Sequence, residues 1–280
     1  MPNVLQTNIN SILAQVASNK TQRDLTKSME KLSTGKRINK AGDDPAGLAV
    51  STKFVAQIKG SNVAANNSSD AIAMIQTADG AMGEISNLMQ RMRELAVQAA
   101  TETYSTSDMS QMDTEYQELE LEVVRIVEQT KWNTISVLDG SGGSSSAGSF
   151  IIQVGSDNAQ SMTITIGDLA ISSGSLGDLD GLAVSSQISA SLAISMIDNA
   201  FEDLNTKRAE MGAYMNRLEH ALNNNLIFNS NMSDSNSRFQ DTDFGNELAE
   251  MAKLQILKQA GDAMLTQANA IPNQVLGLLQ

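Results

Sequence analysis

Few residues of this 280-residue chain have the type and spacing that catalysis requires. The chain has no cysteine and a single histidine, His220, so thiolate metal sites, cysteine nucleophiles and a zinc helix built on two histidines are excluded or nearly so. His220 follows Glu219 and lies two residues from the apolar position Leu218, which predicts a solvated histidine on a helix surface. No catalytic or cofactor-binding set of residues remains, and the sequence predicts that the protein is not an enzyme.

Two aspartate pairs have the spacing of cation ligands. Asp241-Thr-Asp243 lacks the other positions of a calcium-binding loop, so capping of a helix N-terminus is the expected role. Asp178-Leu-Asp180 precedes Gly181 and predicts a turn. We therefore expect no metal site.

Residues 141–149 and 172–181 are rich in glycine and serine and predict loops. The hydroxyls of 141–149 and 172–175 are candidates for O-glycosylation, although a plain flexible loop is the favoured interpretation. Between the loops, residues 150–154 and 162–166 are β-like runs separated by a turn signal that starts at Gly155. This pattern predicts a β-hairpin.

Charge is spread unevenly along the chain. The formal net charge is -13, which argues against nucleic acid and anionic lipid as partners. Residues 1–60 nevertheless hold nine basic and four acidic side chains, a net charge of +5. A basic arm can bind nucleic acid or membrane, but we favour pairing with acidic groups of the same or an adjacent subunit. The sequence contains no run of the ~20 apolar residues that a membrane span needs, and no Sec signal peptide is visible. These features alone predict a cytoplasmic protein.

The remaining sequence predicts long helices with apolar residues three and four apart. Gly35 is expected to end a first helix, and Asp43, Asp44 and Pro45 to begin a second. The first helix starts on a seam of Leu5, Ile9, Ile12 and Val16, followed out of phase by Leu25, Met29 and Leu32. Inner stripes follow at Ile75, Ala78, Met82, Ile85, Met89, Met92, Ala96 and Ala99, and then at Met112, Tyr116, Leu119, Val123 and Ile126.

The carboxy-terminal part contains two more seams, with a polar break expected around 229–238. The first seam is Ile194, Ile197, Phe201, Leu204, Arg208, Met211, Met215, Leu218, Leu222 and Asn225. The second is Leu254, Leu257, Gly261, Met264, Ala268, Ile271, Val275 and Leu278. The fold class expected is mainly α, with coiled-coil or bundle helices from both termini and a small β-hairpin insertion. Apolar stripes at both ends must be buried against each other, against another copy, or both, because an isolated amphipathic helix is marginal in water.

Motifs at both ends resemble the bacterial flagellin family. At the amino-terminal end these are Leu32–Asn39 (LSTGKRIN), Asp43–Leu48 (DDPAGL), Gln76–Glu84 (QTADGAMGE) and Gln90–Gln98 (QRMRELAVQ). At the carboxy-terminal end they are Arg208–Gly212 (RAEMG), Asn216–His220 (NRLEH), Asp241–Asp243 (DTD), Gln255–Gly261 (QILKQAG) and Met264–Asn269 (MLTQAN).

The resemblance implies a structural subunit that polymerises into the flagellar filament for swimming, with terminal helices that fold on assembly. Residues 1–44 and 238–280 would form the paired-helix filament core, and residues 45–237 a helical spoke carrying the hairpin and the loops of about 141–190. The resemblance further implies type III export to an extracellular flagellum, which replaces the cytoplasmic prediction. Implied partners are other copies of the chain, a flagellar export chaperone, and junction and cap proteins.

Four positions match residues that contact the animal Toll-like flagellin receptor in similar flagellins, namely Gln90, Arg91, Leu95 and Glu115. Subunit packing through the same surface is the alternative role. Two positions depart from the family pattern, because Ser61 replaces the usual apolar residue and Gly245 the usual alanine. Large variable outer domains are absent.

Two other functions remain open. A hook–filament junction protein has the same architecture, although Gln267–Leu276 (QANAIPNQVL) favours flagellin. An intracellular coiled-coil adaptor is a less favoured alternative, and it would have termini that are ordered in the monomer.

Overall fold

The computed structural model describes residues 7–143, 148–172 and 174–277, and side chains as far as residue 270. Of the expected seam residues, Leu5 and Leu278 therefore lie outside the described residues, as do the side chains of Ile271 and Val275. The chain forms two compact units. Unit 1 comprises Met1–Ala56 and Asn231–Gln280, and unit 2 is Gln57–Ser230.

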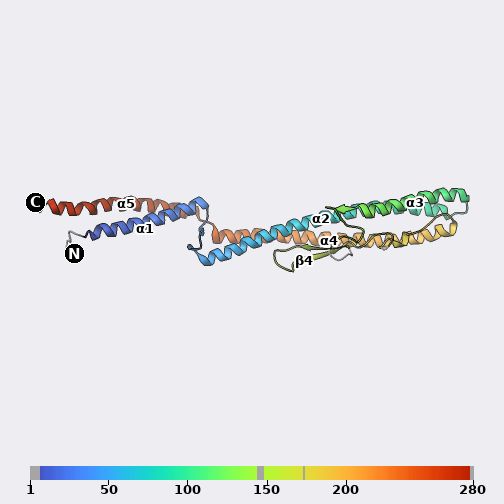
Figure 1. The fold of residues 1–280 in the computed structure, drawn as a ribbon, viewed down its shortest axis with the longest axis horizontal. Coiled ribbons are helices and arrows are strands. Elements are labelled where there is room, and N and C mark those ends of the chain that lie inside the picture. The colour runs from blue at the N-terminus through green and yellow to red at the C-terminus, as the bar shows by residue number, and fades with distance from the viewer. Residues whose placement is uncertain (1–6, 144–147, 173, 278–280) are drawn as a thin grey trace. The chain divides into compact units, whose positions relative to one another are not determined.

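Unit 1 is built on two antiparallel helices, α1 (Ile9–Thr34) and α5 (Phe244–Gly277), which lie side by side with both chain ends at the same end of the pair (Figure 1). The Asn8 side chain caps α1, and Gly35 ends it with φ 69°, a left-handed conformation that favours glycine. The long helix α2 (Pro45–Ala99) begins at Pro45, and the Asp44 carboxylate accepts the Gly47 N–H at 2.9 Å. These boundaries confirm the predicted ones.

Unit 2 packs α2 against α3 (Thr106–Gln129) and the long helix α4 (Gln187–Gln240) around one apolar core. All eight residues of the predicted stripe from Ile75 to Ala99 are buried in this core. None of the ten positions predicted for the seam on α4 is exposed. The 3.5-residue periodicity thus predicted the inner faces of both long helices correctly.

The β-hairpin consists of β3 (Ser149–Gln153) and β4 (Ser161–Thr165), which pair antiparallel with Ile151 opposite Thr163. Phe150, Met162 and Ile164 are buried, whereas Ile151 is exposed, so one face of the hairpin covers the helical core. A smaller pair, β1 (Lys131–Trp132) and β2 (Ile135–Ser136), follows α3, and a short 3-10 helix η1 (Gly177–Leu179) precedes α4.

The polar break predicted around 229–238 was wrong, because α4 continues without interruption to Gln240. Its inward polar residues find partners on α2: the Asn229 amide donates to Asn62 Oδ1 at 2.8 Å, and Asn236 Oδ1 accepts the Ser51 hydroxyl at 2.8 Å. Hydrogen bonds between side chains thus join α4 to α2 in this region. Among the described helices, none is both long and apolar enough to cross a membrane.

Candidate functional site

The inner face of the α1–α5 pair is formed mostly by small side chains on α1 and by larger ones on α5. The positions of reduced exposure include Ser11, Ala14, Ser18, Thr21, Leu25 and Ser28 on α1, and Met251, Leu254, Lys258, Gly261, Leu265 and Ala268 on α5. A Cβ on Gly261 would lie 3.8 Å from Ser18 Cβ, so the helices approach closely there. Polar contacts fix the register along the pair. Asn8 Nδ2 donates to the Ala268 carbonyl at 2.8 Å, and Ser18 Oγ donates to Asp262 Oδ1 at 3.1 Å.

Many other large apolar side chains of the same helices lie outside this inner face. Ile9, Ile12, Leu13 and Val16 are all exposed on α1. On α5, Leu257 is 47% exposed and Met264 is 64% exposed. These two residues are seven apart and so share one face of the helix. The intramolecular pair therefore leaves a row of apolar side chains on each helix unused.

The seam predicted on α5 divides into two sets. Leu254 and Ala268 are buried, and Gly261 is partly buried, against α1. Leu257 and Met264 lie outside the contact with α1. The inner positions are occupied instead by Met251, Lys258 and Leu265. The small residues of α1 that face these inner positions allow the two helices to approach closely. The sequence reasoning identified Leu254, Gly261 and Ala268 on this face. It also included Leu257 and Met264, because apolar residues lie on more than one face of α5.

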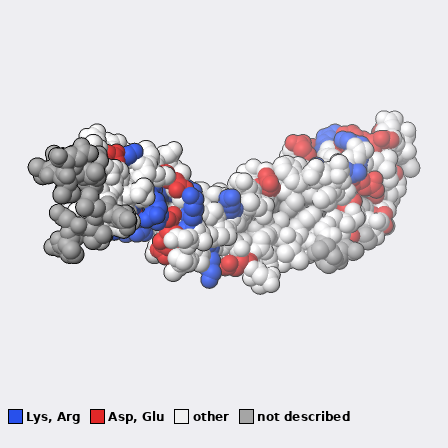
Figure 2. Space-filling view, turned by 60° about the vertical axis from the view of Figure 1, so that its left-hand side comes forward, with Lys and Arg blue, Asp and Glu red and all other residues white. Residues whose placement is uncertain are grey.

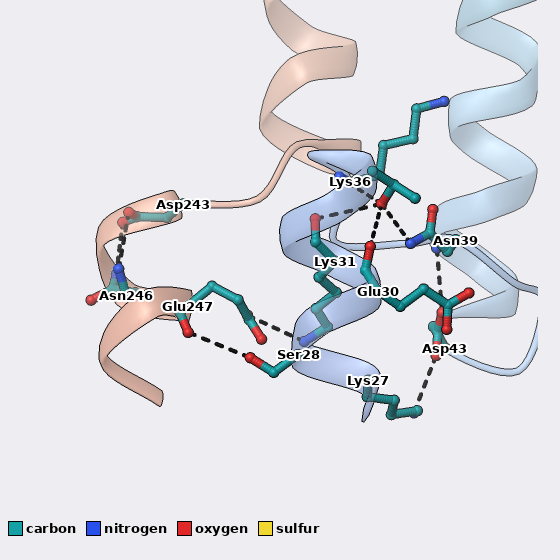
Figure 3. Close-up of polar contacts among 11 residues, drawn as sticks. Lys27, Ser28, Glu30, Lys31, Lys36, Asn39, Asp43, Asp243, Asn246 and Glu247 are labelled. Atoms are coloured by element: carbon teal, nitrogen blue, oxygen red, sulfur yellow. Dashed lines mark hydrogen bonds and ion pairs between the residues drawn. The ribbon is translucent and has the colours of Figure 1, made fainter. Parts of the chain in front are cut away.

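Backbone contacts join the segment that follows α1 to the segment that precedes α5. Lys36 and Asp241 form an isolated antiparallel bridge, the Arg37 N–H donates to the Gln240 carbonyl at 2.6 Å, and the Thr242 N–H donates to the Gly35 carbonyl at 2.9 Å. In Figure 3, Lys31 extends from α1 to the Glu247 carboxylate, and the Ser28 hydroxyl donates to the Glu247 carbonyl. The first turn of α5 is thus fixed to the last turns of α1.

Part of the basic amino-terminal segment is neutralised inside unit 1. On the face in Figure 2, lysine and arginine side chains gather on unit 1, with acidic side chains among them. Lys27 pairs with Asp43 at 3.1 Å and Lys40 with Glu30 at 2.8 Å. The Lys27 ammonium, followed by the backbone N–H groups of Lys40 and Asn39, lowers the pKa of Asp43. Its stabilising contribution is therefore present at neutral pH and is lost only as the pH falls through that lowered pKa.

The four positions that match receptor contacts do not form one exposed set. Gln90, Arg91 and Glu115 are exposed, and the Arg91 guanidinium binds Glu115 Oε1 at 2.7 Å between α2 and α3. Leu95 is only 2% exposed and belongs to the core of unit 2, so it is removed from this candidate surface as a correction. Leu95 lies three residues after the buried Met92 and so shares its side of α2, which explains the burial.

The residues with possible chemical roles are surface and capping groups. Asp243 Oδ1 accepts the N–H groups of Gly245 and Asn246 at 2.9 and 3.3 Å, which confirms the predicted helix cap at the start of α5. His220 is exposed on α4, as predicted. A Cβ on Gly245 would make only an ordinary contact, so nothing in the structure explains glycine there.

A group of polar residues on α2 and α4, which the sequence reasoning missed, binds the turn of the β-hairpin through hydrogen bonds. Asn225 Nδ2 donates to the Val154 carbonyl at 2.9 Å, and its Oδ1 accepts the buried Ser61 hydroxyl at 3.3 Å. Asn67 Nδ2 donates to the Gln153 carbonyl at 3.3 Å. The unusual Ser61 is therefore matched by Asn225 across the helix pair. Two polar residues at inward positions of apolar stripes were the signal available in the sequence.

Asn225→Ala is expected to destabilise unit 2 by about 1–3 kcal/mol, because it leaves the buried Ser61 hydroxyl and the Val154 carbonyl without this partner. Denaturant unfolding followed by the fluorescence of Trp132, the single tryptophan, measures the change. The matched control is Asn224→Ala, at an exposed position of the same helix, with an expected change within about 0.5 kcal/mol. Equal losses of stability in both variants would show that the hydrogen bonds of Asn225 to the hairpin and to Ser61 do not stabilise unit 2.

Comparison with known proteins places these features in a family. Residues 5–142 match the bacterial flagellin N-terminal helical region, and residues 194–279 match the bacterial flagellin C-terminal helical region. The chain is 40% identical over 256 residues to a flagellin of Halalkalibacterium halodurans, covering 91% of each chain. It is 35% identical over 285 residues to the flagellar filament 33 kDa core protein of Treponema phagedenis, covering 99% of this chain and all of that one.

Solved structures agree with the fold. The crystal structure of Bacillus cereus flagellin matches with a TM-score of 0.50 and 34% identity, over 57% of this chain and 88% of that chain. A flagellar hook-associated protein of Vibrio parahaemolyticus matches with a TM-score of 0.60 over 71% of this chain and all of that chain, but at 13% identity it shows the fold alone. The two family regions and the relatives that align over nearly the whole chain establish that this chain belongs to the bacterial flagellin family.

Proposed function

We propose that this chain is a structural subunit that polymerises into the bacterial flagellar filament. The observation that carries the proposal is the unused apolar surface of the α1–α5 pair, where Ile12, Val16, Leu257 and Met264 remain exposed although the two helices contact each other along their length. A flagellar filament core protein is among the relatives. Within this proposal, the terminal helices form the filament core and unit 2 the surrounding spoke.

The energetic reason is apolar burial between copies. Full burial of a Leu, Ile, Val or Met side chain contributes roughly 1.5–3 kcal/mol, so each half-exposed residue of the row gains about half of that. A second copy of the chain has the same exposed apolar side chains on α1 and α5. It can therefore cover those of the first copy, and no other protein is needed. When the rotation that relates neighbouring copies does not close into a ring, the same contact repeats from copy to copy and gives a helical polymer.

The terminal helices are proposed to complete their folding on assembly. The α1–α5 pair has an inner face of mostly small residues on α1, and it leaves many of its larger apolar side chains in water. Limited proteolysis of dilute monomer is expected to cut α1 and α5 well before unit 2. Protease-resistant terminal helices in the monomer would instead favour the coiled-coil adaptor, which is an alternative of a different class.

Elongation of short filament seeds by the purified chain tests the proposed function. We expect bulk growth of long filaments, seen by electron microscopy and by sedimentation. A hook–filament junction protein of the same architecture would bind seeds without elongating them, so bound but short seeds would favour that alternative. The control is the same protein without seeds at a concentration below that of spontaneous growth.

The proposal includes the surroundings that family membership implies. The subunit would be exported by the flagellar type III apparatus with a dedicated chaperone, and would meet junction and cap proteins at the ends of an extracellular filament. Gln90, Arg91 and Glu115 form a candidate surface for packing between subunits or for the animal Toll-like flagellin receptor. As a structural protein, the subunit would need no cofactor.

A further inference from the structure

The methionines differ widely in exposure, from fully buried through partly buried to exposed. The chain contains 15 methionines, of which Met1 lies outside the described residues. Most of the others line the core of unit 2, where Met82, Met89 and Met92 are fully buried. Among the described residues, only Met29 on α1 and Met264 on α5 are exposed, by 45% and 64%. Both lie on the helices that carry the proposed assembly surface.

We propose that Met29 and Met264 are the oxidation sites of the free subunit, and that hydrogen peroxide acting on them blocks polymerisation. This inference rests on the proposed function for its effect on assembly. In the reaction the thioether sulfur attacks one peroxide oxygen and the O–O bond breaks. The sulfur gains that oxygen as a sulfoxide, and the second oxygen leaves with both protons as water. The sulfur is oxidised by two electrons and the peroxide is reduced by two.

Access decides which sulfur reacts, because a thioether is not ionised and has no pKa to tune. The sulfurs of Met82, Met89 and Met92 are shielded by the packed helices of unit 2. Met264 has no such cover, since the inner face of α5 is formed by Met251, Leu254 and Leu265 instead. The free subunit therefore offers the oxidant two sites on unit 1 and none of comparable access in the core of unit 2.

The effect of oxidation on polymerisation follows from the position of Met264 on α5. It shares a helix face with Leu257, the row that another copy is proposed to cover. A sulfoxide is a polar group, and its burial in an apolar contact without a hydrogen-bond partner is unfavourable. Oxidation before assembly would thus prevent the contact, whereas burial in the filament would protect the same sulfur.

The first measurement needs no filament. Full-length monomer is treated with hydrogen peroxide, and peptide mapping by mass spectrometry follows sulfoxide at each methionine with time. We expect Met29 and Met264 to react at least about tenfold faster than Met82 and Met89, as access controls the rate. Equal rates at exposed and buried sites would overturn the site assignment, whether or not the chain forms filaments.

The second measurement compares seeded elongation before and after peroxide. We expect oxidised wild-type protein to elongate about tenfold more slowly, the size of effect that corresponds to ~1.4 kcal/mol in a contact. The variant M29L/M264L keeps apolar side chains of similar volume and is expected to elongate equally well with and without peroxide. The matched variant M82L/M89L, altered only in the core, is expected to remain sensitive.

Normal elongation by fully oxidised wild-type protein would overturn the proposed block. Sensitivity that persists in M29L/M264L would overturn the assignment to these two sulfurs. Failure of untreated wild-type protein to elongate seeds counts against the filament function itself, and the peptide map still decides the oxidation sites. Preformed filaments are the last comparison, and reaction of Met264 as fast there as in monomer would contradict its burial between copies.

Discussion

Leu257→Asp is expected to stop filament growth while leaving the fold of unit 2 unchanged. Leu257 is 47% exposed on α5, outside the contact with α1, so the carboxylate is solvated in the monomer. In a filament it would enter an apolar contact in every copy, and an uncompensated buried charge costs several kcal/mol. We expect the concentration needed for elongation to rise by at least about 100-fold, since ~1.4 kcal/mol corresponds to a factor of ten.

The matched control for this change is Leu121→Asp on α3, because Leu121 is a leucine of unit 2 that is 61% exposed. The same substitution there is expected to leave elongation within a few-fold of the wild type. Circular dichroism and Trp132 fluorescence verify that both monomers remain folded. If Leu121→Asp stops elongation and Leu257→Asp does not, the assembly surface lies on unit 2 and the assignment to the terminal helices is wrong.

The inner faces of the long helices could be predicted from the sequence because they follow one periodicity without interruption. The stripe from Ile75 to Ala99 has apolar residues at alternating intervals of three and four, and a helix places such residues on one face. The boundary at Gly35 and Pro45 was equally accessible, since each residue has a backbone preference of its own. These are local properties that need no knowledge of the partner helix.

The contact face of α5 could be predicted only in part in this way. Leu254, Leu257, Met264 and Leu265 are all apolar, so two overlapping faces satisfy the same periodicity. The choice between them depends on the partner, and α1 presents small residues such as Ala14 and Ser18 to the face that contains Leu254 and Leu265. The information lies in a pairing between residues more than two hundred positions apart.

The end of α4 was misread for a related reason. Asn229 and Asn236 look like loop residues, and their helical conformation is stabilised by Asn62 and Ser51 on α2. Asparagine also forms local hydrogen bonds with the backbone outside helices, so its preference alone favours a break. Of the residues expected on the candidate surface, Arg91 and Glu115 are exposed and form an ion pair, whereas Leu95 is buried by the packing of α2 in the core.

Leu204→Ala is expected to destabilise unit 2 by about 2–5 kcal/mol, because Leu204 is fully buried on α4 and truncation leaves a cavity in a packed core. The matched control is Leu226→Ala, the same substitution on the same helix at an exposed position, with an expected loss below about 1 kcal/mol. Denaturant unfolding followed at Trp132, which packs against this core, measures both changes. Similar losses in the two variants would mean that the core on α4 is not formed as described. Since Leu204 lies in unit 2 and the proposed assembly row lies in unit 1, Leu204→Ala protein that remains folded should still elongate seeds, whereas Leu257→Asp protein should not.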